Sequence, residues 1–128
     1  FCFGKYTSTT NLLKRETFHI LAKDKLINLL YVKDIATAMI SVLESDFNGS
    51  INIASGEQIL IKDLAIKIAN KINAEEILDM DKKSINNNKI YHNKASNEIL
   101  KNYVKWKPTY KLDEGLDETI DWWKKRIN

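Results

Sequence analysis

The feature that most constrains this chain is a stretch in which a short apolar run passes directly into a helical pattern. Leu29–Leu43 opens with apolar residues, and beyond Asp34 the apolar positions adopt helical spacing. A strand that feeds a helix with almost no loop is a unit of layered α/β architecture. We therefore expect a strand over Ile27–Val32 and a helix over Asp34–Glu44. A catalytic carboxylate at Asp34 is the alternative to the role that its position favours, the N-cap of this helix.

Composition sets the limits within which this unit has to be placed. The 128 residues, 44% of them apolar and 29% charged, are typical of one globular domain, here residues 1–128. The net charge of +3, with acidic and basic residues interspersed, does not indicate a nucleic-acid surface, and no apolar run is long enough to span a membrane. Cys2 is the only cysteine, which excludes an internal disulfide and a cysteine metal cluster and favours a cytoplasmic location.

The remaining pattern predicts helices with a few short strands. The chain begins on Phe1–Gly4, which reads as the end of an apolar strand, so we expect it to be a piece of a longer protein. Asp81–Lys89 is rich in Asn and Lys and is predicted to be a loop. The other predicted helices are Leu12–Lys23, Ile61–Ile72, Lys94–Lys101 and Leu112–Ile127, and the other predicted strands are Phe1–Phe3, Ser50–Ile53 and Ile77–Met80.

Four segments, in order, resemble one known family. Tyr31-Val-Lys-Asp-Ile-Ala-Thr-Ala38 resembles the "hVdDvA-x-A" segment of the extended short-chain dehydrogenase/reductases. Gly49–Glu57 resembles the strand and turn "G-x-x-yN-i-g-s-G-e", Ile61–Ala69 the "s-i-k-e-l-a" helix, and Trp106–Trp122 the terminal "W-x-P" block of that family. The resemblance implies an α/β fold, namely the C-terminal, substrate-binding portion of an NAD-dependent sugar-nucleotide epimerase or dehydratase, with the Rossmann cofactor half missing.

The resemblance also implies a function for the complete protein, which would be an isomerase or lyase that moves a hydride between a sugar and NAD or NADP. Its implied partners are a nucleotide-sugar substrate and an N-terminal Rossmann domain, and a homodimer is compatible with it. The four glycines, Gly4, Gly49, Gly56 and Gly115, lie too far apart for a phosphate-binding turn. We therefore expect this chain to bind no cofactor or metal, to hold no catalytic residue and to be inactive when isolated.

Two departures keep a rival interpretation open. The family often has Arg-Asp where this chain has Ile27 and Asn28, and an Asn where it has Phe1. The rival is a non-catalytic interaction or scaffold domain that has kept the fold without the site. If the site is kept, the best candidates for substrate contacts are Lys14, Arg15 and Tyr31, because they flank the loop and the strand end where the family opens its cleft.

One pair imitates the family's catalytic Tyr-x-x-x-Lys. Tyr103 and Lys107 have the right spacing, but Pro108 disfavours helix at the residue before it. We expect the helix to end before Trp106, the indole ring to pack inward and the pair to carry no chemistry.

Other polar and aromatic residues receive structural interpretations. Asn52 is expected to be a buried amide rather than a substrate contact. His19 and His92, which are far apart, and Asp79 with Asp81 are not expected to bind a metal. Trp123 belongs to the apolar stripe of the last helix, whereas Trp122 lies off it and is a candidate partner surface.

Overall fold

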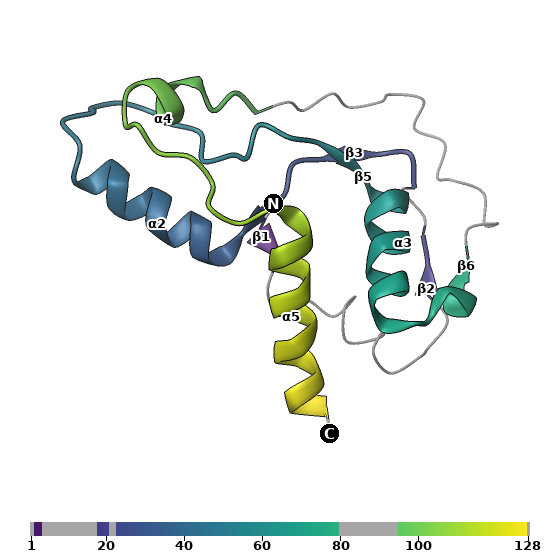
Figure 1. The fold of residues 1–128 in the computed structure, drawn as a ribbon. Helices are drawn as coiled ribbons and strands as arrows, with labels where there is room; N and C mark the ends of the chain where they lie inside the picture. The colour runs from purple at the N-terminus through teal and green to yellow at the C-terminus, as the bar shows by residue number, and fades with distance from the viewer. Residues whose placement is uncertain (1, 4–17, 21–22, 80–94, 128) are drawn as a thin grey trace.

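The computed structural model describes residues 2–3, 18–20, 23–79 and 95–127 of the chain. Four helices and six short strands lie along these residues in a mixed α/β arrangement (Figure 1). The helices are α2 (Val32–Leu43), α3 (Ile61–Ile72), α4 (Glu98–Asn102) and α5 (Leu112–Ile127), with a 3₁₀ turn at Glu75–Ile77. The strands are β1 (Cys2–Phe3), β2 (Phe18–His19), β3 (Leu26–Ile27), β4 (Leu30–Tyr31), β5 (Ile59–Leu60) and β6 (Leu78–Asp79).

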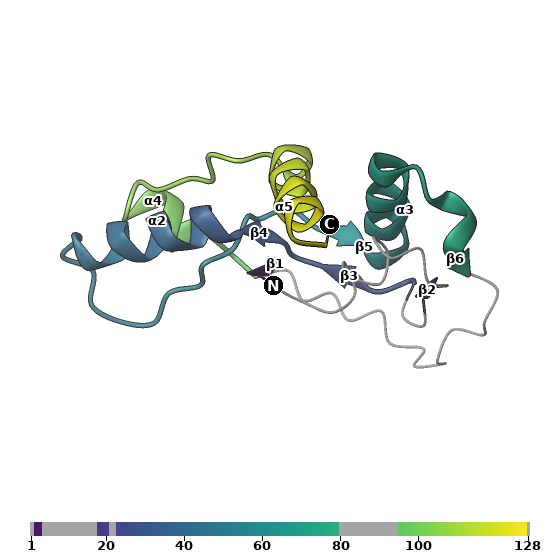
Figure 2. The same ribbon diagram turned by 90° about the horizontal axis from the view of Figure 1, so that it is seen from below.

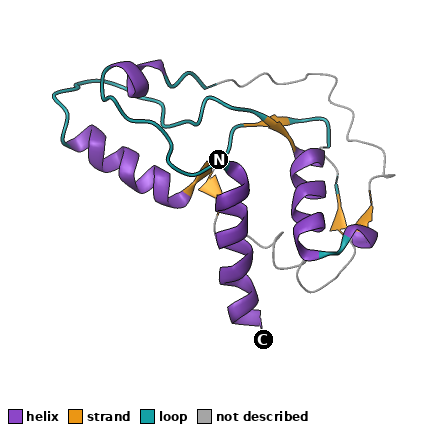
Figure 3. Cartoon of the chain, viewed as in Figure 1, coloured by secondary structure: helices purple, strands orange, loops and turns teal. Residues whose placement is uncertain are grey.

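The strands form three separate pairs (Figure 3). β1 pairs with β4 and β2 with β6, both in parallel, whereas β3 and β5 are antiparallel. The expected strand over Ile27–Val32 is therefore two strands, interrupted at residues 28–29, and Val32 already belongs to α2.

Both long helices of the first half begin directly after a strand. α2 follows β4 and α3 follows β5 without an intervening residue, as the sequence predicted for α2. No side chain caps α3; its first N–H groups, of Ile61 and Lys62, donate instead to the backbone carbonyls of Lys25 and Lys23. This contact satisfies orphan donors of the helix and fixes α3 against the segment that leads into β3.

The larger core cluster lies between α2 and the segment around α4. Its buried residues are Leu30, Ala38, Leu100 and Trp106, and partly buried aliphatic side chains such as Ile51 and Ile53 surround it. A smaller cluster joins the end of α3 to the 3₁₀ turn through Ala74 and Ile77. α5 stands beside α3 and contacts β4 (Figures 1 and 2). α3 and α5 are the predicted helices with the predicted ends.

Several sequence expectations are wrong. Phe18–His19 is a strand paired with β6, so the helix predicted over Leu12–Lys23 does not continue through it; residues 12–17 and 21–22 of that prediction lie outside the described part. Ser50–Ile53 is not a strand, because its isoleucines anchor a loop to the core. Asn52 is exposed rather than buried. Strand β5 was not predicted, because its apolar residues merge with the start of the α3 pattern.

Candidate functional site

The described part of the chain forms a cavity of about 660 Å³. Three segments enclose it: the end of the β4 region, the turn before β5, and the segment that joins Pro108 to the first turn of α5. Its lining residues are Leu29, Leu30, Tyr31, Ser55, Glu57, Gln58, Ile59, Pro108, Thr109, Tyr110, Lys111, Leu112 and Asp113. A volume of this size is in the range of small-ligand sites.

Asp34 holds one wall of this cavity in place. The side chain is only 1% exposed, and its two carboxylate oxygens accept the backbone N–H groups of Thr109 at 2.9 Å and Tyr110 at 3.1 Å. The prediction that Asp34 caps its own helix is wrong: Tyr31 occupies the N-cap position of α2 and no side chain caps it. A buried carboxylate with two charge-assisted hydrogen bonds instead ties α2 to the Pro108–Asp113 segment.

Asn28 and Asn97 hold the opposite wall. The Asn28 amide donates to the carbonyl of Glu57 at 2.8 Å, and its oxygen accepts the backbone N–H of Ser55 at 3.2 Å. The Asn97 amide donates to the carbonyl of Ser55 at 3.0 Å. Gly56, with a φ of +82°, lies so close that a Cβ on it would be 2.8 Å from the Asn97 amide nitrogen. The positive φ therefore favours glycine at this turn, and any larger residue would also have to displace the Asn97 amide.

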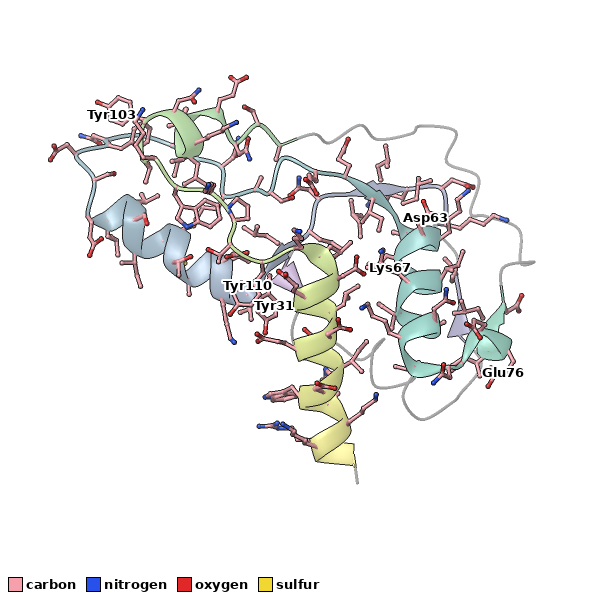
Figure 4. All side chains as sticks on the ribbon, in the orientation of Figure 1. Tyr31, Asp63, Lys67, Glu76, Tyr103 and Tyr110 are labelled. Carbon is pink, nitrogen blue, oxygen red and sulfur yellow. The ribbon has the colours of Figure 1, made fainter. Side chains whose placement is uncertain are left out.

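Tyr31, the one predicted substrate contact within the described residues, does line the cavity. Its hydroxyl donates to the Glu118 carboxylate at 2.8 Å, and its ring lies 4.8 Å from that of Tyr110 (Figure 4). Burial and, next, the hydrogen bond to Glu118 raise the pKa of Tyr31 to about 12. The phenol is therefore neutral at physiological pH and offers a ring surface rather than a base.

Lys33 lies beside these two tyrosine rings. Its ammonium forms an ion pair with Glu118 and stands 5.4 Å from the centre of the Tyr110 ring. The hydrogen bond to Glu118 raises the pKa of Lys33, and the same bond lowers the pKa of Glu118. The charges of this cluster therefore balance one another, and we assign it to fixing Tyr31 and Tyr110 at the cavity edge.

Gln58 lines the cavity. Its amide nitrogen is buried and has no hydrogen-bond partner among the described residues. A buried donor without a partner is destabilising. Gln58, Tyr110 and Asn28 were not predicted as site residues. Gln58 lies between two of the matched segments, Tyr110 lies in the terminal block without a role assigned to it, and Asn28 was interpreted only as a departure from the family's Arg-Asp.

The other candidate positions contribute less. Lys14 and Arg15 lie outside the described residues. The prediction for the Tyr103 and Lys107 pair is confirmed in its geometry: α4 ends at Asn102, both side chains are exposed and no hydrogen bond joins them. Trp106 packs inward as predicted, its ring N–H donating to the Thr37 hydroxyl at 3.1 Å.

Nothing in the described part of the chain fits a bound dinucleotide or metal. A dinucleotide site needs glycines where a strand turns into a helix, so that the backbone can approach the pyrophosphate. Here the two strand-to-helix steps carry Tyr31-Val32 and Leu60-Ile61. Among the described residues no group of three or more His, Cys, Asp or Glu side chains could hold a metal, and none of the helices is long and apolar enough to cross a membrane.

Comparison with known proteins finds solved structures that share this architecture. No protein-family model matches the sequence, and no curated protein matches it significantly. Solved structures do match: the enzyme WbmF of Bordetella bronchiseptica, in complex with NADH, has a TM-score of 0.79 at 27% identity, over 94% of this chain and 36% of that one. The chain has the fold of the C-terminal part of an extended short-chain dehydrogenase/reductase.

Two further solved structures also match the fold of this chain. UDP-N-acetylglucosamine 4-epimerase of Methanobrevibacter ruminantium, in complex with UDP-N-acetylmuramic acid, is 27% identical, with a TM-score of 0.80 over 98% of this chain and 44% of that one. UDP-glucose 4-epimerase of Thermotoga maritima, with UDP-glucose, reaches a TM-score of 0.83 at 18% identity, over 99% of this chain and 44% of that one. The chain thus spans less than half the length of these structures.

Proposed function

We propose that this chain is the substrate-binding part of an NAD(P)-dependent nucleotide-sugar epimerase or dehydratase. The observation that carries the proposal is the match, over 98% of the chain and at 27% identity, to an epimerase solved with a UDP-sugar acid bound. The catalytic Tyr and Lys and the dinucleotide site would lie in the other part of the protein. This chain would supply one wall of the cleft and take no part in proton or hydride transfer.

The cavity suits an uncharged part of such a substrate better than its diphosphate. Glu57 and Asp113 lie on its wall against a single cation, Lys111. The Tyr31 and Tyr110 rings offer a surface on which a base or a sugar ring can stack. Gln58 lines the same cavity, and its buried amide nitrogen would become a donor to a carbonyl or hydroxyl oxygen once the amide turns toward the ligand. We therefore assign the cavity to the base or sugar end and leave the diphosphate to the cleft beyond it, where Lys14 and Arg15 remain the proposed contacts.

The test is the affinity of the full-length protein for UDP-glucose and UDP-N-acetylglucosamine, measured by titration calorimetry. We expect Gln58→Leu to weaken binding by about tenfold, because one buried hydrogen bond to the ligand is lost. Asn52→Leu is the matched control: it removes an exposed amide that does not line the cavity, and its affinity should equal that of the wild type. Equal loss in both variants would refute the assignment of the cavity, and absence of any nucleotide-sugar binding would refute the function.

A non-catalytic scaffold is the second candidate, and Ile27 is the observation that favours it. Ile27 lies in β3, paired with Ile59, at the place where the family often has a phosphate-binding Arg. The scaffold reading predicts a full-length protein that binds neither a nucleotide sugar nor NAD(P). Conversion of a UDP-sugar or dTDP-sugar, followed by proton NMR of the sugar, would exclude it.

A further inference from the structure

The loop that follows α2 carries the one Asn-Gly pair of the sequence, Asn48-Gly49. Both residues are exposed, and Gly49 has a φ of +142°, a conformation that favours glycine. Within the described residues, no hydrogen bond holds the Asn48 side-chain amide or the Gly49 N–H. The amide and the backbone nitrogen that follows it therefore lie together in an exposed segment, and neither is engaged elsewhere.

The chain is held on both sides of this pair. On one side, the Phe47 ring meets the Tyr103 ring edge-on, with the ring centres 5.5 Å apart, at the corner of the molecule where Figure 4 labels Tyr103. On the other side, Ile51 packs against the larger core cluster. Asn48 and Gly49 thus form a short span between two fixed points, and Gly49 has no side chain that could shield its nitrogen.

This arrangement permits a reaction within the chain, and asparagine is among the thermolabile residues of proteins. The Gly49 nitrogen attacks Cγ of the Asn48 side-chain amide, the bond from Cγ to Nδ2 breaks, and ammonia leaves with the proton of the Gly49 N–H. Water then opens the cyclic imide. Cleavage of the newly formed bond gives aspartate, whereas cleavage of the original peptide bond gives isoaspartate, in which the main chain runs through Cγ.

We propose that Asn48-Gly49 is a site of spontaneous deamidation in the native protein. Two other asparagines show what distinguishes it. The Asn97 amide is engaged, because it donates to the carbonyl of Ser55 at 3.0 Å. Asn52 is exposed in the same loop, but it is followed by Ile53, whose β-branched side chain crowds the backbone nitrogen. Asn52 is therefore the matched internal control. The inference stands apart from the proposed function, because it involves neither the cavity nor a ligand.

The two products change the loop in different ways. Aspartate adds a carboxylate two residues from Asp46, which is also exposed, and leaves the path of the backbone unchanged. Isoaspartate adds a carbon atom to the backbone between Phe47 and Ile51, so these two anchors can no longer both keep their places. We expect isoaspartate, and not the added charge, to loosen the contact between Phe47 and Tyr103.

The first test is incubation of the full-length protein in mildly alkaline buffer, native and in urea, followed by tandem mass spectrometry of the loop peptide. We expect Asn48 to deamidate in the native protein at a rate within about fivefold of its rate in urea, because an exposed loop opens at almost no cost in free energy. Asn52 should remain intact over the same period. Stronger protection of Asn48 in the native state, or equal rates at Asn48 and Asn52, would overturn the proposal.

Two substitutions test the consequence for the loop. Asn48→Ser removes the amide, and freshly prepared Asn48→Asp supplies the charge on an ordinary backbone. After incubation, the wild type should contain isoaspartate, detected with an isoaspartyl methyltransferase, and its thermal midpoint should be lower by about 2 °C. The midpoint of Asn48→Ser should not change on incubation, and that of fresh Asn48→Asp should equal the fresh wild type. An unchanged midpoint in wild type that contains isoaspartate, or an equal loss in Asn48→Ser, would refute loosening by isoaspartate, and a loss already present in fresh Asn48→Asp would assign it to the charge.

Discussion

At the residue scale, the carboxylate of Asp34 connects α2 to the segment that enters α5. Its two oxygens accept the backbone N–H groups of Thr109 and Tyr110, which lie 75 and 76 positions further along the chain. Asp34, at the start of α2, therefore holds in place a cavity wall that is formed by residues far away in the sequence.

Asp63 provides a control for Asp34. Both are the third residue of a helix that follows directly on a strand, but Asp63 is exposed and makes no hydrogen bond in the described part of the chain. We expect Asp34→Ala to lower the free energy of unfolding by about 3 kcal/mol, because two partly buried N–H groups lose their buried carboxylate acceptor. Asp63→Ala should cost about 0.5 kcal/mol or less, the value of a helix-dipole contact alone. Urea denaturation measures both, and equal losses would show that Asp34 acts only on its own helix.

Tyr31 gives a prediction in the alkaline range. Its pKa of about 12 in the folded protein lies above the ordinary value of 10.0, so the neutral phenol stabilises the fold. That contribution is fully present below pH 10.0 and is lost as the pH rises toward 12. Glu118→Gln should lower the pKa of Tyr31 but leave it above the ordinary value, since burial is the larger cause. Alkaline titration of the tyrosinate signal checks this, with Asp117→Asn as the neighbouring control that should not change it.

At the element scale, α3 and α5 are joined by an exposed ladder of ion pairs. Lys67 contacts Asp113 at 3.0 Å, and Lys71 contacts Asp117 at 2.6 Å (Figure 4 labels Lys67 on α3). The hydrogen bond from Lys67 lowers the pKa of Asp113, so this contribution is lost as the pH falls through that depressed value. The ladder fixes the first turns of α5, and with them Asp113 at the cavity.

A double-mutant cycle measures the ladder. Lys71→Ala, Asp117→Ala and the double variant should give a coupling free energy of about 0.5 kcal/mol at low salt, because exposed pairs are weak. The coupling should shrink further at high salt, where screening is stronger. A coupling that does not depend on salt would mean that packing, and not charge, joins the two helices.

Local pattern was sufficient for some elements and not for others. α3 and α5 were predictable because their apolar residues repeat over several turns. The lack of helix at Lys107 was predictable because Pro108 disfavours helix at the residue before it. β2 and β5 were not, because each strand is two residues long and exists only through its partner. The walls of the cavity could not be predicted either. The side chains of Asn28, Asp34 and Asn97 form hydrogen bonds with backbone groups far away in the sequence, and no local spacing of residues indicates such pairs.

At the scale of the whole molecule, the absence of a glycine turn at either strand-to-helix step predicts how the chain treats dinucleotides. The 128-residue chain should show no saturable micromolar binding of NAD or NADP in calorimetry, because neither strand-to-helix step of the described residues has the glycines that let backbone approach a pyrophosphate. Saturable binding of either dinucleotide would contradict this.

We proposed that the catalytic Tyr and Lys lie in the other part of the protein, and this proposal predicts the effect of a substitution at Tyr103. Tyr103→Phe in the full-length protein should leave turnover nearly unchanged, whereas loss of a proton-transferring Tyr would cost about a hundredfold or more. Steady-state kinetics with a nucleotide sugar makes the comparison, and a collapse of kcat in this variant would place chemistry on this chain after all.

The bonds from Tyr31, Asp34 and Thr37 to the C-terminal part of the chain also impose an order on folding. They join residues 69 to 87 positions apart, so the segment around α2 leaves the ribosome long before Trp106, Thr109 and Glu118 are synthesised. Contacts of such high sequence separation form late and slow the search for the native state. Until the C-terminal residues have been synthesised, the side of α2 that packs into the larger core has no lasting partner. The nascent chain then exposes an aggregation-prone apolar helix.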